Sequence, residues 1–492
     1  MRLYSIGLGT FTRAISSTNP DAQAYFNQGF QMMYAFAKPE AIASFREARR
    51  RDPSCAICFW GEAWAYGPYL NGPMAPADGP AAYAAAQRAL ELATHATPNE
   101  RALIEAMATR YGPSFDEETR AQFDRAYADA MARVAAAYPD DLDAGTLYAE
   151  ALFLLEPRRG LRDVEAPSVR RLHAELERVL AMNVHHPGAC HFYVHATEST
   201  VVPERAEACA EFLGRSIPGA SHINHMPSHT WNEIGRWGDS VRANIEAWHS
   251  DLKAEVGEGF AIYPSHNLHM LFYAASMDGQ GAIAIQAAKD YAKLMGDTGF
   301  HALTLVRFGR FDEVEAVGTR PVQGVSAGFW DFAQGYSRLR MGEARAARQY
   351  LARVREGARS PARFRFHSAA DLLGVVGDIL EGELDRAAGD LPTAIARFER
   401  AVIAEDGLSY DEPEPLPFAA RHWLGAALLE AGRPADAERV YREELDDHPH
   451  NGWSLIGLRQ ALIAQQKSTA DVDADFASSW ARSDTWIRAS RF

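Results

Sequence analysis

The stretch AQAYFNQGFQMMYAFAKPEAIASFREARRRDP, residues 22–53, has the spacing of two helices that pack against each other. Gly29 stands in its first half, and Ala41 follows twelve residues later, ahead of Phe45. A small residue lets the second helix cross closely, and the alanine and the aromatic ring fill the contact. Pro53 ends the unit because proline cannot continue a helix. The stretch therefore predicts one helix–turn–helix unit.

Three further copies of this spacing lie in the C-terminal third of the chain. They comprise Gly335, Gly342, Ala347 and Leu351; Gly382, Gly389, Ala394, Phe398 and Ala401; and Gly425, Gly432, Ala437, Tyr441 and Pro449. The four copies resemble the tetratricopeptide repeat (TPR), a helix–turn–helix unit of about 34 residues. No alternating strand pattern competes with the helical one. The resemblance implies an all-α, TPR-like α-solenoid, a right-handed superhelix whose concave groove would bind a peptide or a protein partner.

The repeats favour one continuous array over separate domains. Length alone, at 492 residues, would suggest about three domains. We expect instead N-terminal TPR-like repeats with a Cys-x-x-Cys pair over residues 1–150, and histidine-rich repeats over 151–310. C-terminal TPR repeats and a cap would follow over 311–492. Longer loops, such as residues 71–80 and 405–416, would interrupt the array.

Charge and composition exclude several classes of function. The formal charge of −15 argues against non-specific binding of nucleic acid, which needs a basic surface. No stretch of about 18 apolar residues occurs, so we expect no membrane span. Residues 1–20 make a poor signal peptide, which predicts a soluble, cytoplasmic protein. Four cysteines are too few for a disulfide scaffold.

Histidines gather in one part of the chain, because ten of the 17 lie between His185 and His269. The segment PGACHFYVHATEST, residues 187–200, places His191, His195 and Glu198 at i, i+4 and i+7, on one face of a helix.

Two further segments repeat the pattern. PGASHINHMPSHTWNE, residues 218–233, places His222, His225 and His229 at i, i+3 and i+7, and Pro227 inside this run would kink or break the helix. PSHNLHMLFY, residues 264–273, carries a third pair at i, i+3, His266 and His269.

These histidines predict a metal site. The opening Pro-Gly-Ala-x-His occurs twice, so His191 and His222 would take equivalent places on neighbouring helices, about 8–10 Å apart. Imidazoles on facing helices can then meet at one ion. The predicted ligands are His191, His195, His222, His225, His229, His266 and His269, with Glu198 and Tyr193 as catalytic residues. Two alternatives stay open, a buried polar network of histidines and carboxylates, and a metal-free substrate or acid–base pocket.

The donor set favours redox chemistry. Imidazole suits copper, iron, zinc and nickel. Phe192 stands where the His-Glu-x-x-His motif of zinc proteases has its catalytic glutamate, which disfavours peptidase chemistry. We therefore predict a copper- or iron-dependent oxidoreductase, with zinc as an alternative. Its small-molecule or peptide substrate would lie in a pocket lined by aromatic residues such as Trp60, Trp64 and Trp231. The alternatives are a TPR scaffold that binds protein partners, and a metal-binding or metal-delivery protein without turnover.

The four cysteines carry a weaker signal. Cys55 and Cys58 form a lone Cys-x-x-Cys, for which we predict two buried apolar thiols rather than a redox dithiol. Cys190 and Cys209 have no signature of a partner.

Four segments together resemble a family of bacterial TPR-domain proteins. They are residues 22–36, 40–53, 55–74 and the pair 185–200 with 218–237, and the blocks His-Pro-Gly-Ala-x-His and His-Met-Pro-Ser-His are hallmarks of that family. The resemblance covers about residues 7–300 and implies the fold more firmly than an activity. Members often have Asn-His after the phenylalanine of the first helix, where this chain has Ala37 and Lys38 after Phe36, so no role of that histidine carries over.

Overall fold

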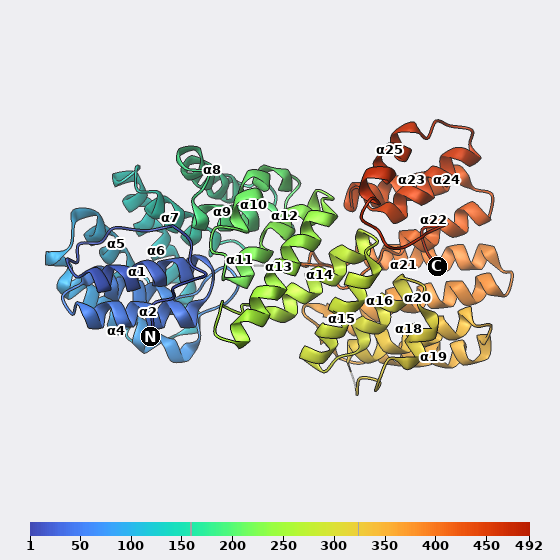
Figure 1. Cartoon of the computed structure of the whole chain (residues 1–492), viewed down its shortest axis with the longest axis horizontal. Coiled ribbons are helices and arrows are strands. Elements are labelled where there is room, and N and C mark those ends of the chain that lie inside the picture. Colours follow the sequence, from blue (N-terminus) through green and yellow to red (C-terminus); the bar gives the residue numbers. More distant parts are fainter. Residues whose placement is uncertain (158–159, 323) are drawn as a thin grey trace. The chain divides into compact units, whose positions relative to one another are not determined.

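The computed structural model describes residues 1–157, 160–322 and 324–492, and helices make up most of it (Figure 1). The first helices are α1 Pro20–Tyr34, α2 Lys38–Arg51, α3 Ala56–Tyr66, α4 Gly79–Leu92, α5 Pro98–Ala108, α6 Glu117–Ala137, α7 Leu142–Phe153, α8 Pro167–Met182, α9 Pro187–Thr197, α10 Glu207–Leu213, α11 Ser221–His225, α12 Pro227–Glu233 and α13 Trp237–Glu255. Short 3₁₀ helices lie at Pro76–Asp78, Ala93–His95 and Pro203–Ala206.

The rest of the chain is also helical apart from a small hairpin. Its helices are α14 Pro264–Met277, α15 Gly281–Met295, α16 Gly299–Arg307, α17 Phe311–Ala316, α18 Val325–Arg340, α19 Ala344–Gly357, α20 Ala369–Ala387, α21 Leu391–Asp406, α22 Arg421–Glu430, α23 Pro434–Asp447, α24 Gly452–Ala464 and α25 Ala470–Ser479. Strands β1 Arg363–Phe364 and β2 His367–Ser368 pair antiparallel.

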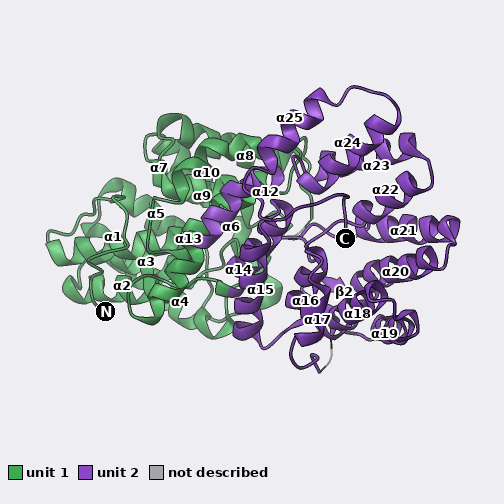
Figure 2. Cartoon of the chain, turned by 45° about the vertical axis from the view of Figure 1, so that its right-hand side comes forward, with its two compact units in different colours: residues 1–230, 246–264 green, residues 231–245, 265–492 purple. Residues whose placement is uncertain are grey.

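The chain divides into two compact units (Figure 2). The first unit comprises Met1–Thr230 and Glu246–Pro264, and the second comprises Trp231–Ile245 and Ser265–Phe492. The three sections expected from the sequence stay a prediction.

The first hairpin forms as its sequence predicts. Asn19 caps α1 through its side chain, and Pro20 occupies the first turn, where its missing N–H costs nothing. The Phe45 ring of α2 is fully buried, and a Cβ built on Gly29 would lie 2.9 Å from it. Glycine is therefore needed for the close approach of α1 and α2.

The repeats of the second unit use the same contact. A Cβ on Gly382 would lie 2.6 Å from the Phe398 ring, and one on Gly425 would lie 2.4 Å from the Tyr441 ring. Gly342, Gly389 and Gly432, at the turns, have φ between +69° and +87°, a left-handed backbone that glycine adopts freely. In the remaining copy, Gly335 faces Leu380 and Tyr350 rather than the predicted Leu351. The chain is thus an all-α, TPR-like α-solenoid.

A helix must be long and apolar to cross a membrane. Across the residues that the structure describes, no helix combines the length and the apolar character that crossing a membrane requires.

Candidate metal site

Helix α9 is anchored by the residues that open it. The His186 ring caps the helix by accepting from the Ala189 N–H at 3.1 Å, and Pro187 stands in the first turn. The Nε2 atom of His186 lies 3.1 Å from Asp143, which also accepts from the Tyr34 hydroxyl at 2.7 Å. The whole of α9 is buried.

The glycine of the His-Pro-Gly-Ala segment, Gly188, allows close packing of α9 on α1. A Cβ at this position would lie 2.3 Å from the Tyr34 ring, so α9 can lie against α1 only with glycine here. The segment therefore builds a cap, a helix start and a close crossing one turn ahead of His191. No sequence pattern predicts these contacts of His186, Tyr34 and Asp143.

The second histidine segment breaks at its proline, as predicted. Helix α11 ends at His225 and α12 begins at Pro227, with Met226 between them. Ser221, at the start of α11, donates its backbone N–H to the Phe260 carbonyl at 3.1 Å. Two short helices, rather than one kinked helix, therefore present His222, His225 and His229.

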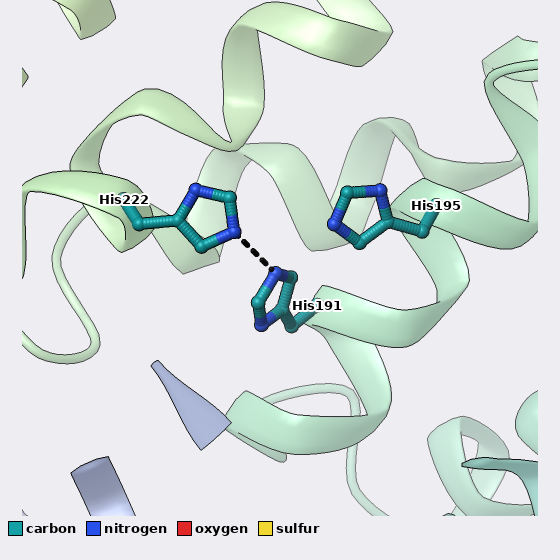
Figure 3. A group of neighbouring side chains, drawn as sticks. All are labelled: His191, His195 and His222. Atoms are coloured by element: carbon teal, nitrogen blue, oxygen red, sulfur yellow. Dashed lines mark hydrogen bonds between the residues drawn. The ribbon is translucent and has the colours of Figure 1, made fainter. Parts of the chain in front are cut away.

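Three histidines of the first unit converge on one point (Figure 3). One ring nitrogen of each of His191, His195 and His222 lies within 4.8 Å of the others, and all three side chains are buried. The Nε2 atoms of His191 and His222 are 3.1 Å apart. Two imidazole ligands of one tetrahedral zinc ion, each about 2.1 Å from it, would have nitrogens about 3.4 Å apart. The observed separation fits a shared ion.

The Nδ1 atoms of two rings, His191 and His195, act as hydrogen-bond donors. The Nδ1 atom of His191 donates to the Tyr34 carbonyl at 2.6 Å, because a carbonyl oxygen can only accept. His195 Nδ1 donates to Glu198 Oε1 at 2.7 Å. Each neutral ring therefore keeps a lone pair on Nε2, and His195 Nε2 has no hydrogen-bond partner among the described residues. A carboxylate or carbonyl behind a histidine is typical of metal ligands.

Glu198 joins the remaining histidines to this group. Its Oε2 atom accepts from His229 Nδ1, and His229 Nε2 lies 2.8 Å from His225 Nε2. Burial raises the pKa of Glu198, but His229 and His195 outweigh it and hold this pKa below its usual range. The carboxylate is thus ionised and can only accept. Five predicted histidines and Glu198 form one buried cluster, which we call the histidine cluster.

The pKa values of the rings favour neutral imidazole. Burial, followed by the neighbouring His195, lowers the pKa of His191 well below its ordinary value. Burial and then His191 do the same for His222, and burial lowers the pKa of His195. Neutral imidazole is the form that binds metals.

Two aromatic residues cover the histidine cluster on strained backbone. The Phe36 ring lies 4.2 Å from the His191 ring and stacks on His195 and His222 at 6.0 and 5.4 Å. Tyr263 lies 5.1 Å from the His222 ring. Phe36 and Tyr263 have φ of 60° and 58°, a left-handed conformation that costs a non-glycine residue on the order of 1–3 kcal/mol and that clusters at functional sites. No sequence pattern predicts that either residue covers the histidines.

Tyr193 is not directed at the histidine cluster, and the part predicted for His266 and His269 in this cluster stays a prediction. The Tyr193 hydroxyl donates to Glu177 of α8 at 2.7 Å, so it is engaged away from the rings. His266 and His269 belong to the second unit. His269 packs there against Phe272 and Phe300, with ring centroids 4.7 and 4.9 Å away, and its Nδ1 accepts from Arg365 at 3.1 Å.

The tryptophans predicted to line a substrate pocket pack against other residues. Trp60 and Trp64 are fully buried beside Phe30 in the core of the first unit, and Trp64 Nε1 donates to Glu150 at 3.0 Å. Trp231 lies in the second unit, beneath the Arg236 guanidinium.

The predicted free thiols are wrong, because both cysteine pairs are disulfides. Cys55 bonds to Cys58 at the start of α3, and Cys190 bonds to Cys209. The second bond joins α9 to α10 next to His191. This bond could not be predicted from the sequence, because the two cysteines are 19 residues apart without a recognisable motif.

Comparison with known proteins assigns no family to this chain. No protein-family model and no curated protein matches this sequence. Among solved structures, the chain is similar to the APC/C hetero-tetramer Cut9–Hcn1, with 12% identity, a TM-score of 0.30, and coverage of 98% of this chain and 78% of that one. Yeast Tom70 gives 12% identity and a TM-score of 0.28 over 95% and 93% of the chains. The P58(IPK) TPR domain gives 12% and 0.22 over 91% and 98%. At these TM-scores the superpositions carry no argument about function.

Proposed function

We propose that this chain is a TPR-like repeat protein whose first unit binds a transition-metal ion. The carrying observation is the geometry of His191, His195 and His222. Their ring nitrogens converge in a buried place, and two of the rings are turned by acceptors so that Nε2 keeps its lone pair. A purely structural network would instead be expected to pair the Nε2 atom of His195, which finds no hydrogen-bond partner among the described residues.

The ligand atoms restrict which metal ions could bind. Three neutral imidazoles suit zinc, copper, iron or nickel better than magnesium or calcium. Copper or iron would agree with the oxidoreductase predicted from the sequence, and would supply electron-transfer chemistry when bound. Glu198 would orient His195 and His229 and hold their Nδ1 protons. Tyr193 has no place in this proposal, because its hydroxyl is engaged with Glu177.

Metal content tests the proposal directly. Protein purified without a histidine tag should hold about one equivalent of metal, or take it up from added copper, iron or zinc. The double variant with His191→Ala and His195→Ala should contain less than about 0.2 equivalents of metal. His95→Ala removes an exposed histidine of the same unit and should change nothing. Equal metal content in all three proteins would overturn the site, and an oxidase assay of the loaded protein would test turnover separately.

A second candidate function is protein binding, and the repeated hairpins favour it. The contacts of Gly382 with Phe398 and of Gly425 with Tyr441 build stacked helical pairs, an architecture that offers extended binding surfaces. The charge of −15 would favour basic partner segments. Cross-linking of the wild type and of the metal-free double variant in cell extract should recover the same partner. A partner that is also recovered with an unrelated acidic protein would contradict this function.

The family resemblance and the cellular compartment belong to the same proposal. The roles of His186, Pro187, Gly188 and His191 support a relation to bacterial TPR-domain proteins with these histidine blocks.

Disulfides persist mainly in oxidising compartments, so the two bonds favour such a compartment over the predicted cytoplasm. Alkylation of protein taken directly from cells, followed by mass spectrometry, should find Cys190 and Cys209 unmodified.

A further inference from the structure

A second group of metal-ligating side chains lies in the second unit, around His448. This residue follows the last residue of α23, and its backbone N–H bonds the Glu444 carbonyl at 2.7 Å. The His448 side chain is 9% exposed, while Glu414 and Asp447 beside it are 42% and 62% exposed. A buried imidazole therefore lies beneath carboxylates that reach solvent.

The imidazole of His448 has the orientation of a metal ligand. Its Nδ1 lies 2.8 Å from Glu444 Oε1, and its Nε2 lies 3.3 Å from Glu414 Oε1. The Tyr273 hydroxyl of α14 is 3.0 Å from the same Nε2. Both ring nitrogens thus face carboxylates, which raise the pKa of His448 although burial lowers it. A cation bound at Nε2 would displace the proton that Glu414 accepts, while Glu444 on Nδ1 would keep the ring oriented.

The carboxylates can complete a coordination sphere. One ligand atom each of Glu414, Asp447 and His448 lies within 4.8 Å of the other two. Glu444 is buried, and its Oε2 atom has no hydrogen-bond partner among the described residues. A buried carboxylate oxygen without a partner is costly, and a cation nearby would offset that cost.

Negative charge is in excess around this point. Glu405, Glu414, Glu444 and Asp447 surround His448, and burial together with the neighbouring carboxylates raises the pKa values of Glu405 and Glu444. The nearby Arg421 is already paired with Asp406 at 2.6 Å. The group thus has more carboxylates than cations.

We propose that Glu414, Asp447 and His448, supported by Glu444 and Tyr273, bind a divalent cation of the manganese type. One imidazole with several carboxylates suits Mn²⁺, whereas the imidazole-rich histidine cluster suits copper or zinc. The two sites would therefore differ in metal preference. A cation here would join α14, α23 and the segment that carries Glu414 within the second unit.

Titration with Mn²⁺ tests this site independently of the histidine cluster. The electron paramagnetic resonance signal of free Mn²⁺ should show one bound equivalent in the wild type and in the variant with His191→Ala and His195→Ala. Glu414→Gln should weaken binding at least about tenfold, because it removes a charged ligand without changing the shape of the side chain.

Glu443→Gln is the matched control, since Glu443 is 44% exposed on α23 and pairs with Arg439. It should bind Mn²⁺ as the wild type does. His448→Gln should also lose binding, and circular dichroism would verify that it folds. Equal binding by the wild type and Glu414→Gln, or no binding by the wild type up to about 1 mM Mn²⁺, would show an ion-pair cluster without a ligand. Loss of Mn²⁺ only in the histidine-cluster variant would place the ion in the first unit and overturn this inference.

Discussion

Phe36 shows how one residue can link backbone strain to a site. Its left-handed backbone takes the place of the turn glycines in the other repeats, and its ring covers the histidine cluster. A conformation that is unfavourable for phenylalanine persists because the packed rings hold it there.

The first prediction concerns this cover. Phe36→Leu should cost about 1 kcal/mol of unfolding free energy, and so should Phe26→Leu, which alters a fully buried ring in the core of α1. Only Phe36→Leu should release metal to a chelator faster, because the Phe36 ring lies against the histidines and the Phe26 ring does not. Stopped-flow release of the bound metal would measure this, and equal rates for the two variants would argue against a cover.

Glu198 is a second single residue on which the site depends, because it fixes the tautomers of His195 and His229. Glu198→Gln leaves one acceptor oxygen for two Nδ1 donors, so one ring must turn or move its proton to Nε2. We expect metal affinity to fall by about 10- to 100-fold, measured by competition with a chelator. Glu177→Gln, which alters the partner of Tyr193, should leave affinity unchanged. A comparable loss in Glu177→Gln would instead bring Tyr193 back into the site.

Helix α9 owes its position to a glycine contact. A Cβ on Gly188 would meet the Tyr34 ring, whereas a Cβ on Gly374 in α20 would meet nothing within 4 Å. The two glycines therefore differ in their surroundings although both lie in helices.

Alanine at these two positions should have opposite effects. Gly188→Ala should destabilise the protein by about 1–3 kcal/mol through overpacking. Gly374→Ala should stabilise it by up to about 1 kcal/mol, because alanine favours the helix. Denaturant unfolding followed by circular dichroism would measure both. A neutral Gly188→Ala would mean that α1 and α9 separate easily and that the histidine cluster is less rigid than we infer.

Across the molecule, buried histidines make stability depend on pH. His191, His195 and His222 have folded pKa values below the unfolded value of 6.5, so the unfolded chain binds more protons below that pH. Their contribution is fully present above about pH 6.5 and is lost as the pH falls, by up to about 1.4 kcal/mol per pH unit for each histidine.

Hydrogen exchange can locate this effect. In metal-free protein, amides of α9 and α11 should exchange faster at pH 5.5 than at pH 7 after correction for intrinsic rates. His448 has the opposite sign, because Glu414 and Glu444 raise its pKa, and its contribution is lost only as the pH rises. Helix α23 should therefore gain no exchange at pH 5.5. Uniform loss of protection over both units would contradict the assignment to the histidine cluster.

The sequence by itself determined the helical hairpins, the break at Pro227 and the shared faces of His191, His195 and Glu198. These features follow from spacing along one helix or one turn, which is local geometry. Only the tertiary structure decided that five histidines of the first unit lie together, that His266 and His269 belong to the second unit, and that Tyr193 turns to Glu177. It also decided the bond between Cys190 and Cys209, the cover formed by Phe36, and the group around His448. Each of these depends on how helices distant in the chain pack, and no periodicity within a single helix encodes that.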